Sequence, residues 1–166
     1  MTSEVISRVV TFVVLVLAQT LVLNHIHLFG VGTPLLYVFF ILHFRRNYPK
    51  WGILLWGFLL GLSIDMFSNT PGLTAASLTL LSLLQPYVLE SFVPRDSEDN
   101  LLPGMRTLGV SKFIYYTIFM VLLYAVAFFS LEAFNFFNWL HWLLCIGSSM
   151  LLTVVLILAI ENLYKR

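Results

Sequence analysis

The chain has 166 residues, of which 60% are hydrophobic and 10% are charged, and its mean hydropathy is +0.93. A soluble domain is about 45–50% apolar and about 25% charged, so this composition excludes an ordinary soluble domain and predicts an integral membrane protein. The formal net charge of +1 and the scattered basic residues also argue against a nucleic-acid partner.

Six apolar stretches are long enough to cross a hydrocarbon core of about 30 Å as helices. In chain order they are residues 5–25, 28–44, 51–67, 72–92, 110–131 and 139–164. The second is the weakest, because Gly30, Gly32 and Pro34 interrupt its beginning; it is expected to be short, tilted or entered through a loop. The predicted fold is therefore all-α: one membrane domain, residues 1–166, with six transmembrane helices in a compact bundle.

The lysines and arginines predict the orientation of this bundle. With six spans, all nine basic residues fall on one side: Arg8, Arg45, Arg46, Lys50, Arg95, Arg106, Lys112, Lys165 and Arg166. Basic residues near helix ends are retained in the cytoplasm, so both termini are predicted to be cytoplasmic. The segment 93–112 on this side is expected to be a solvated loop with a turn at Pro103 and Gly104.

No sequence pattern of an intramembrane hydrolase is present, neither a nucleophile with a base nor a zinc motif such as H-E-x-x-H. Asp65 and Glu132 are expected at similar depth near the outer side, which leaves a carboxylate pair as one possible arrangement. Nothing in the sequence around either acid resembles a known catalytic setting. The chain is therefore predicted not to be an enzyme.

Histidine and cysteine do not predict a metal site either. His25 and His27 are two residues apart and would point about 200° from each other on a helix, so they are expected to be interfacial anchors. His43 and His141 are interpreted in the same way, and the lone Cys145 as a small buried residue. No metal and no cofactor is predicted.

The stretch "WGFLLGLSID" places Gly57, Gly61 and Asp65 on one face of the third predicted helix. In lipid, small residues allow helix backbones to approach and polar side chains bond across the interface, so this face is predicted to pack against another helix. Three roles are open for Asp65: a cap on the helix end or on the turn "SNTPG", a link to a neighbouring helix, or ligand binding.

Small and polar residues also mark two later stretches. Residues 72–92 carry a stripe of Ala75, Thr79, Ser82 and Pro86, and Pro86 is expected to kink the helix. The sixth stretch contains the small residues 147–149. The third, fourth and sixth helices are therefore expected to pack closely together.

These features resemble the rod shape-determining membrane protein MreD family. The resemblance rests on the length, the six-helix topology with both ends inside, and "GFLLGLSIDMFSNTPGLTAAS". The family pattern is a glycine pair, an aspartate soon after, then a glycine before a helix rich in small residues. In this chain those positions are Gly57, Gly61, Asp65 and Gly72, and Pro34 matches the proline of the family's second helix.

The resemblance implies a non-enzymatic subunit of the elongation machinery (elongasome), which carries out peptidoglycan synthesis and sets cell shape in rod-shaped bacteria. It implies a location in the cytoplasmic membrane, an association with the membrane helix of MreC, and an indirect link to MreB, RodA and a class B penicillin-binding protein. It also implies a fold similar to that of the substrate-binding S subunits of energy-coupling-factor vitamin transporters.

Three hypotheses follow from this resemblance. In the first, the bundle is a scaffold that binds MreC, with Gly57, Gly61 and Asp65 shaping or supporting the groove, so that a bulky residue at Gly61 weakens the complex without preventing insertion. In the second, the chain is an S subunit of a vitamin transporter, although its first helix has only Ala18 where such subunits carry an A-x-x-x-A pair. In the third, a pocket holds a membrane lipid or a lipid-linked wall precursor without chemistry.

Overall fold

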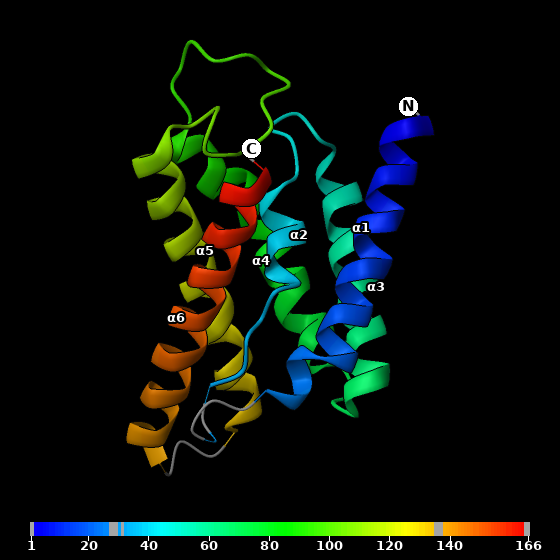
Figure 1. The fold of residues 1–166 in the computed structure, drawn as a ribbon, viewed down its shortest axis with the longest axis vertical. Coiled ribbons are helices and arrows are strands. Elements are labelled where there is room, and N and C mark those ends of the chain that lie inside the picture. Colours follow the sequence, from blue (N-terminus) through cyan, green and yellow to red (C-terminus); the bar gives the residue numbers. More distant parts are fainter. Residues whose placement is uncertain (1, 27–29, 31, 135–137, 165–166) are drawn as a thin grey trace.

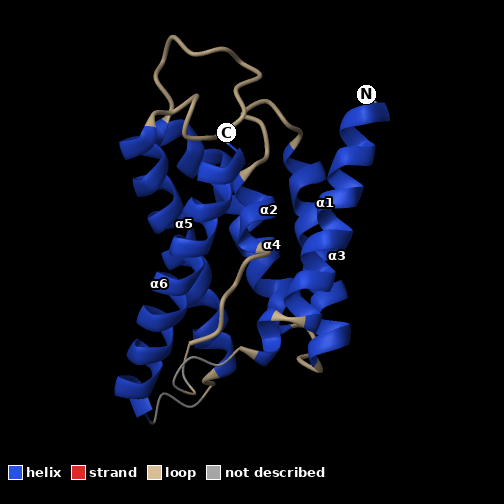
Figure 2. Ribbon diagram, viewed as in Figure 1, coloured by secondary structure: helices blue, strands red, loops and turns tan. Residues whose placement is uncertain are grey.

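The computed structural model describes residues 2–26, 30, 32–134 and 138–164, and its regular elements are helices (Figures 1 and 2). They are α1 (Thr2–Leu21), the 3₁₀ turn η1 (Leu23–His25), α2 (Val38–Leu42), α3 (Lys50–Ser68), α4 (Leu73–Phe92), α5 (Val110–Glu132) and α6 (Trp139–Tyr164). The five long helices coincide with predicted stretches to within a few residues. The predicted all-α fold class is confirmed.

Four helical segments are long and apolar enough to cross a membrane: Thr2–His25, Lys50–Ser68, Val110–Glu132 and Trp139–Tyr164. They support the prediction of a membrane protein. α4 is 20 residues long but is not among these four, and its buried residues include the polar Thr74, Ser77, Ser82 and Gln85. A complete set of six spans, and the orientation of the termini, stay predictions.

The second predicted span, residues 28–44, is not one long helix. Among its described residues, 32–37 form a non-helical segment and α2 has five residues. α2 occupies the centre of the bundle, where Val38, Ile41 and Leu42 have no exposed surface (Figure 1). The stretch was expected to be short, tilted or entered through a loop, and the structure shows a short helix that follows a non-helical segment. Five helical residues do not cross a membrane by themselves.

Side chains from distant helices compensate for the missing helical hydrogen bonds of this segment. Three of its N–H groups donate to side-chain oxygens: Thr33 N to Ser149 Oγ (3.1 Å), Leu35 N to Thr153 Oγ1 (3.0 Å) and Leu36 N to Gln19 Oε1 (3.2 Å). Pro34 is buried, has no N–H to satisfy, and its carbonyl accepts a bond of 2.9 Å from Gln19 Nε2. Irregular backbone is tolerated at membrane depth only when its polar groups are satisfied in this way.

Side chains of α4 and α5 likewise donate hydrogen bonds to the carbonyl groups at the end of α2. The Tyr116 hydroxyl donates to Leu42 O and Gln85 Nε2 donates to Phe44 O, each at 3.3 Å. Both donors are fully buried. A five-residue helix has too few internal bonds to be stable alone, so α2 depends on α4 and α5 for its position.

Helices that follow one another in the chain pack side by side: α3 on α4, α4 on α5 and α5 on α6, with α1 against α3 (Figure 1). The expectation that the sixth helix packs closely on the third and fourth is not met. α6 packs on α5, and its Ser148 lies against Gly32. Residues 32–42 take the central position instead: Gly32 lies against Ser148 of α6, and α2 contacts α1, α4 and α5.

The described basic residues lie at one end of the bundle. This end holds the start of α1, the end of α6 and residues 93–109, the longest described connection between helices (Figure 1). Lys165 and Arg166 lie outside the described residues. In the loop, the Leu108 N–H donates to Gly104 O at 3.0 Å, in agreement with the turn expected at Pro103 and Gly104. We call this the basic end and the other the opposite end.

Candidate functional site

Gly57 and Gly61 lie on the face of α3 that packs against α4. A Cβ atom on Gly61 would lie 2.5 Å from Ala75 Cα and 2.8 Å from Thr74 O, closer than real Cβ atoms approach. A Cβ atom on Gly57 would lie 3.1 Å from Ser82 Cβ. Both glycines therefore allow the two backbones to approach closely, which stabilises helix pairs in lipid through van der Waals contact.

Asp65 joins the end of α3 to the start of α4. It is 4% exposed, and its Oδ1 accepts hydrogen bonds from Thr70 Oγ1 (3.0 Å) and Thr74 N (2.9 Å). Its Oδ2 accepts a bond from Ala75 N at 2.9 Å. The first N–H groups of a helix have no partner within it and favour negative charge, so Asp65 of α3 caps the N-terminus of α4.

The turn between α3 and α4 contains two residues with positive φ. Asn69 ends α3 with φ of 56°, and Gly72 precedes α4 with φ of 80°. Asparagine is one of the few residues with a Cβ that adopts this conformation readily, and glycine adopts it without steric cost. The positive φ of Gly72 therefore explains why a glycine stands at this position of the turn.

The four motif residues form one unit, the α3–α4 hairpin, defined here by Gly57, Gly61, Asp65 and Gly72. Two of the roles left open for Asp65, a cap on the turn and a link to the next helix, are fulfilled together by its carboxylate. The face that was expected to shape a partner groove is covered by α4 of the same chain. A bulky residue at Gly61 would therefore disturb the chain's own packing first.

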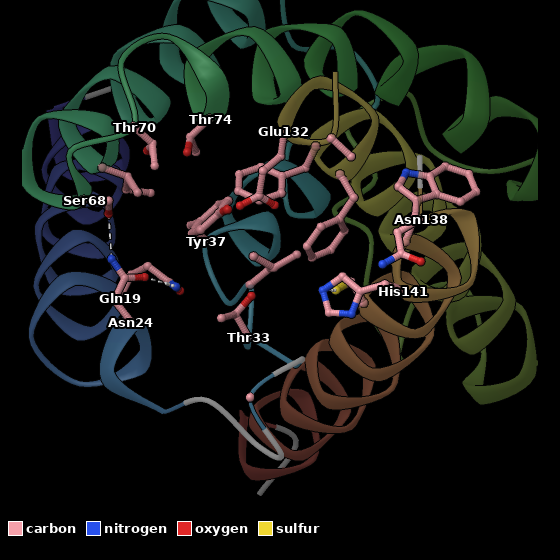
Figure 3. Close-up of a pocket in the computed structure, with 18 residues that line it drawn as sticks. Gln19, Asn24, Thr33, Tyr37, Ser68, Thr70, Thr74, Glu132, Asn138 and His141 are labelled. Atoms are coloured by element: carbon pink, nitrogen blue, oxygen red, sulfur yellow. Dashed lines mark hydrogen bonds between the residues drawn. The ribbon is translucent and has the colours of Figure 1, made fainter. Parts of the chain in front are cut away.

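A polar cavity of about 590 Å³ lies at the opposite end of the bundle, beside this hairpin (Figure 3). Its polar lining combines residues that are far apart in the sequence: Gln19, Asn24, Thr33, Tyr37, Ser68, Thr70, Thr74, Glu132, Asn138 and His141. Two of the hypotheses drawn from the resemblance include a pocket, but the sequence did not predict which residues line it. Isolated polar residues in apolar stretches, such as Gln19, were its only signal, and their spacing does not indicate that they meet.

One side of the cavity, the paired wall, consists of residues that are already hydrogen-bonded. Gln19 Nε2 donates to Asn24 Oδ1 at 2.9 Å, and Asn24 Nδ2 donates to Ser68 Oγ at 2.6 Å. Thr70 bonds to Asp65, as described above. Deeper in the cavity, the hydroxyls of Tyr37 and Tyr124 lie 2.6 Å apart. These bonds link α1 to η1, η1 to α3, and the segment before α2 to α5.

The other side, the open wall, carries Glu132, Asn138 and His141 (Figure 3). The side chains of Glu132 and Asn138 have no hydrogen-bond partner among the residues that the structure describes. His141 Nε2 lies 3.6 Å from Cys145 Sγ, one turn along α6. These three residues are exposed, so their polar groups are accessible to a bound molecule.

The other predicted anchors take varied positions. His43 is half-buried near the basic end, where its Nε2 lies 3.0 Å from Glu161 Oε2 and its Nδ1 lies 3.1 Å from Phe39 O. Glu161 Oε1 also accepts a bond of 3.1 Å from Met105 N, so it ties α6 to the loop. His25 is exposed, and His27 lies outside the described residues.

Asp65 and Glu132 do not face a common site. Glu132 lines the cavity and Asp65 does not, and both Asp65 oxygens are occupied by the N-terminus of α4. Within the described ranges, no three His, Cys, Asp or Glu side chains are placed to hold a metal ion. The cavity lining combines polar side chains with apolar and aromatic ones.

Comparison with known proteins adds no assignment to this geometry. No family model, curated protein or solved structure matches the chain.

Proposed function

We propose that the chain is a non-enzymatic scaffold subunit of the bacterial elongation machinery, similar to MreD. In this role it binds the membrane helix of MreC in the cytoplasmic membrane and helps to organise RodA and a class B penicillin-binding protein. The proposal rests on the sequence resemblance. The α3–α4 hairpin is the observation that carries it, because the four motif residues act there as one structural unit.

The small share of the described chain that lies outside the helices also supports a scaffold role. Outside the helices, the longest described connection is residues 93–109, too short for a domain of its own. Partner binding would then depend on helix faces and on this loop. α1 offers such a face, since only Leu15, Val16 and Gln19 of its residues are buried.

Copurification in mild detergent tests the proposal. The tagged chain is expressed with MreC from the same host, and an unrelated single-span membrane protein serves as the control for specificity. Capture of MreC and not of the control is expected. Failure of the wild-type chain to capture MreC, at a normal membrane level, would overturn the scaffold proposal.

Gly61→Leu is a poor variant for locating the contact, because it would disturb the α3–α4 hairpin. Val13→Phe on α1 and Val126→Phe on α5 are better matched, since the two valines are 47% and 39% exposed. Loss of MreC with one variant and not the other would assign the contact to that helix. Equal capture by both would place the contact on other surfaces.

A second candidate function is favoured by the polar cavity. A bundle with a cavity of about 590 Å³ at one end is suited to binding a small molecule, as in the S subunit of an energy-coupling-factor vitamin transporter. A vitamin retained through purification, and identified by mass spectrometry of the extracted chain, would support this function. A ligand-free chain that captures MreC would favour the scaffold.

A further inference from the structure

The polar groups in the two walls of the cavity differ in whether they already have hydrogen-bond partners. In the paired wall, Gln19, Asn24 and Ser68 bond to one another or to backbone, so a ligand would have to displace existing bonds. In the open wall, Glu132 and Asn138 have no partner among the described residues. A bound molecule gains most from the groups that are not yet satisfied.

The charge of the lining favours one sign of ligand. Glu132 is the only Asp, Glu, Lys or Arg among the described residues that line the cavity, and it lies within electrostatic range of His141. The described lysines and arginines are at the basic end of the bundle. An anion would therefore meet a carboxylate with no lysine or arginine among the described lining residues, whereas a cation would pair with that carboxylate.

Aromatic rings give the cavity a second property that suits an organic cation. Phe128, Phe129, Trp142 and Tyr37 all line the cavity. Tyr37 lies close to Glu132 (Figure 3). The faces of such rings attract ammonium groups and also accept an apolar body. The cavity volume is within the range of sites for small organic molecules.

We propose that this cavity binds a molecule with a protonated amine, which Glu132 recognises by ion pairing while Asn138 accepts a further hydrogen bond and the aromatic rings hold the apolar part. The amine belongs either to a free small molecule or to the headgroup of an aminophospholipid. The inference deepens the second candidate function, because it names the ligand class of that cavity. It does not depend on binding to MreC.

Calorimetric titration of the full chain in nanodiscs of phosphatidylglycerol, a lipid whose headgroup has no amine, tests the proposal. Phenethylamine is the probe and 2-phenylethanol, which has the same ring and no charge, is its neutral counterpart. Glu132→Gln removes the charge at nearly constant shape, and Glu90→Gln removes the same charge from an exposed position of α4 outside the cavity lining. Comparison of wild type, Glu132→Gln and Glu90→Gln with the same probe in one disc composition cancels attraction of the amine to the lipid surface.

We expect saturable binding of phenethylamine, at least about tenfold weaker binding of 2-phenylethanol, and a similar loss in Glu132→Gln but not in Glu90→Gln. Binding should also change the tryptophan fluorescence, and Trp142→Phe should remove that change. Equal affinity for both probes, or unchanged affinity in Glu132→Gln, would overturn the proposal.

Phosphatidylethanolamine nanodiscs distinguish the two sources of the amine. Native mass spectrometry that finds this lipid on the wild type and not on Glu132→Gln, with weaker phenethylamine binding in these discs, indicates a headgroup site. Unchanged phenethylamine binding in these discs indicates a soluble amine. Absence of both lipid retention and probe binding would overturn the proposal, and MreC capture by Glu132→Gln shows separately whether the scaffold function persists.

Discussion

At the scale of single residues, polar side chains in this protein mainly satisfy backbone groups of other segments. Asp65 accepts two N–H bonds from α4. Gln19 donates to Pro34 O and to Asn24 Oδ1, and accepts a bond from Leu36 N. A side chain in such a position is costly to replace, because its loss leaves buried backbone groups without partners.

Asp65→Asn is predicted to destabilise the protein. The amide keeps the volume but replaces one acceptor oxygen with a donor that faces an N–H group. We expect a loss of about 1–3 kcal/mol in the free energy of unfolding. Denaturation by sodium dodecyl sulfate in mixed micelles measures it, with the exposed Glu90→Gln as the control. Equal stability of Asp65→Asn and wild type would show that the carboxylate does not cap α4.

Gln19→Leu is predicted to destabilise the protein by about 1–3 kcal/mol, because Leu36 N and Pro34 O lose their partner. Thr20→Val is a suitable control, since the Thr20 hydroxyl bonds to carbonyls within α1. The same micelle denaturation compares the two variants. If the free energy of unfolding falls equally little in both variants, the hydrogen bonds from Gln19 to residues 34 and 36 do not contribute to stability.

At the scale of elements, the close contact of α3 with α4 depends on Gly57 and Gly61, which have no side chains. A side chain at Gly61 would meet backbone atoms of Thr74 and Ala75 in α4. Backbone atoms cannot rotate away as a flexible side chain could. Two helices that meet at backbone must separate to accommodate an added methyl group, and this reduces packing along their whole length.

Gly61→Ala is therefore predicted to destabilise the α3–α4 hairpin by about 1–3 kcal/mol. Gly147→Ala in α6 is the matched control, because a Cβ there would meet no atom within 4 Å. Gly147→Ala should be neutral or slightly stabilising, since alanine favours helix. Thermal unfolding followed by size-exclusion chromatography of fluorescent fusions compares them, and a stability of Gly61→Ala equal to that of Gly147→Ala would contradict this packing.

At the scale of the whole molecule, the basic end and the cavity lie at opposite ends of the bundle. With the basic end in the cytoplasm, as the positions of lysine and arginine predict, the cavity opens toward the outer side. A scaffold would then present its loop, residues 93–109, to cytoplasmic proteins, while a ligand would arrive from outside or from the outer leaflet.

Cysteine labelling in intact cells measures this orientation. Single cysteines are introduced in a Cys145→Ser background at Glu98 in the loop and at Phe134, which is 84% exposed at the opposite end. A membrane-impermeant maleimide should label Phe134→Cys in intact cells and Glu98→Cys only after permeabilisation. The reverse pattern would invert the orientation, and labelling of both would contradict a bundle that separates the two ends.

Much of the fold follows from local sequence. The long helices, their approximate limits and the clustering of basic residues could be predicted because composition and apolar length act within one segment. The Gly57, Gly61 and Asp65 face was also predicted, since helical spacing determines which residues share a face.

The tertiary structure alone decided what that face meets, where α6 packs, and that a polar cavity exists. Leu35 N and Thr153 Oγ1 are 118 positions apart in sequence and 3.0 Å apart in space, and no periodicity within either segment indicates this bond. Spacing identifies the polar groups that need a partner in lipid, but the partner is chosen by the arrangement of all helices. The wall of Glu132, Asn138 and His141 likewise combines the end of α5 with the start of α6 and the residue before it, and no pattern within either helix indicates that these side chains line one cavity.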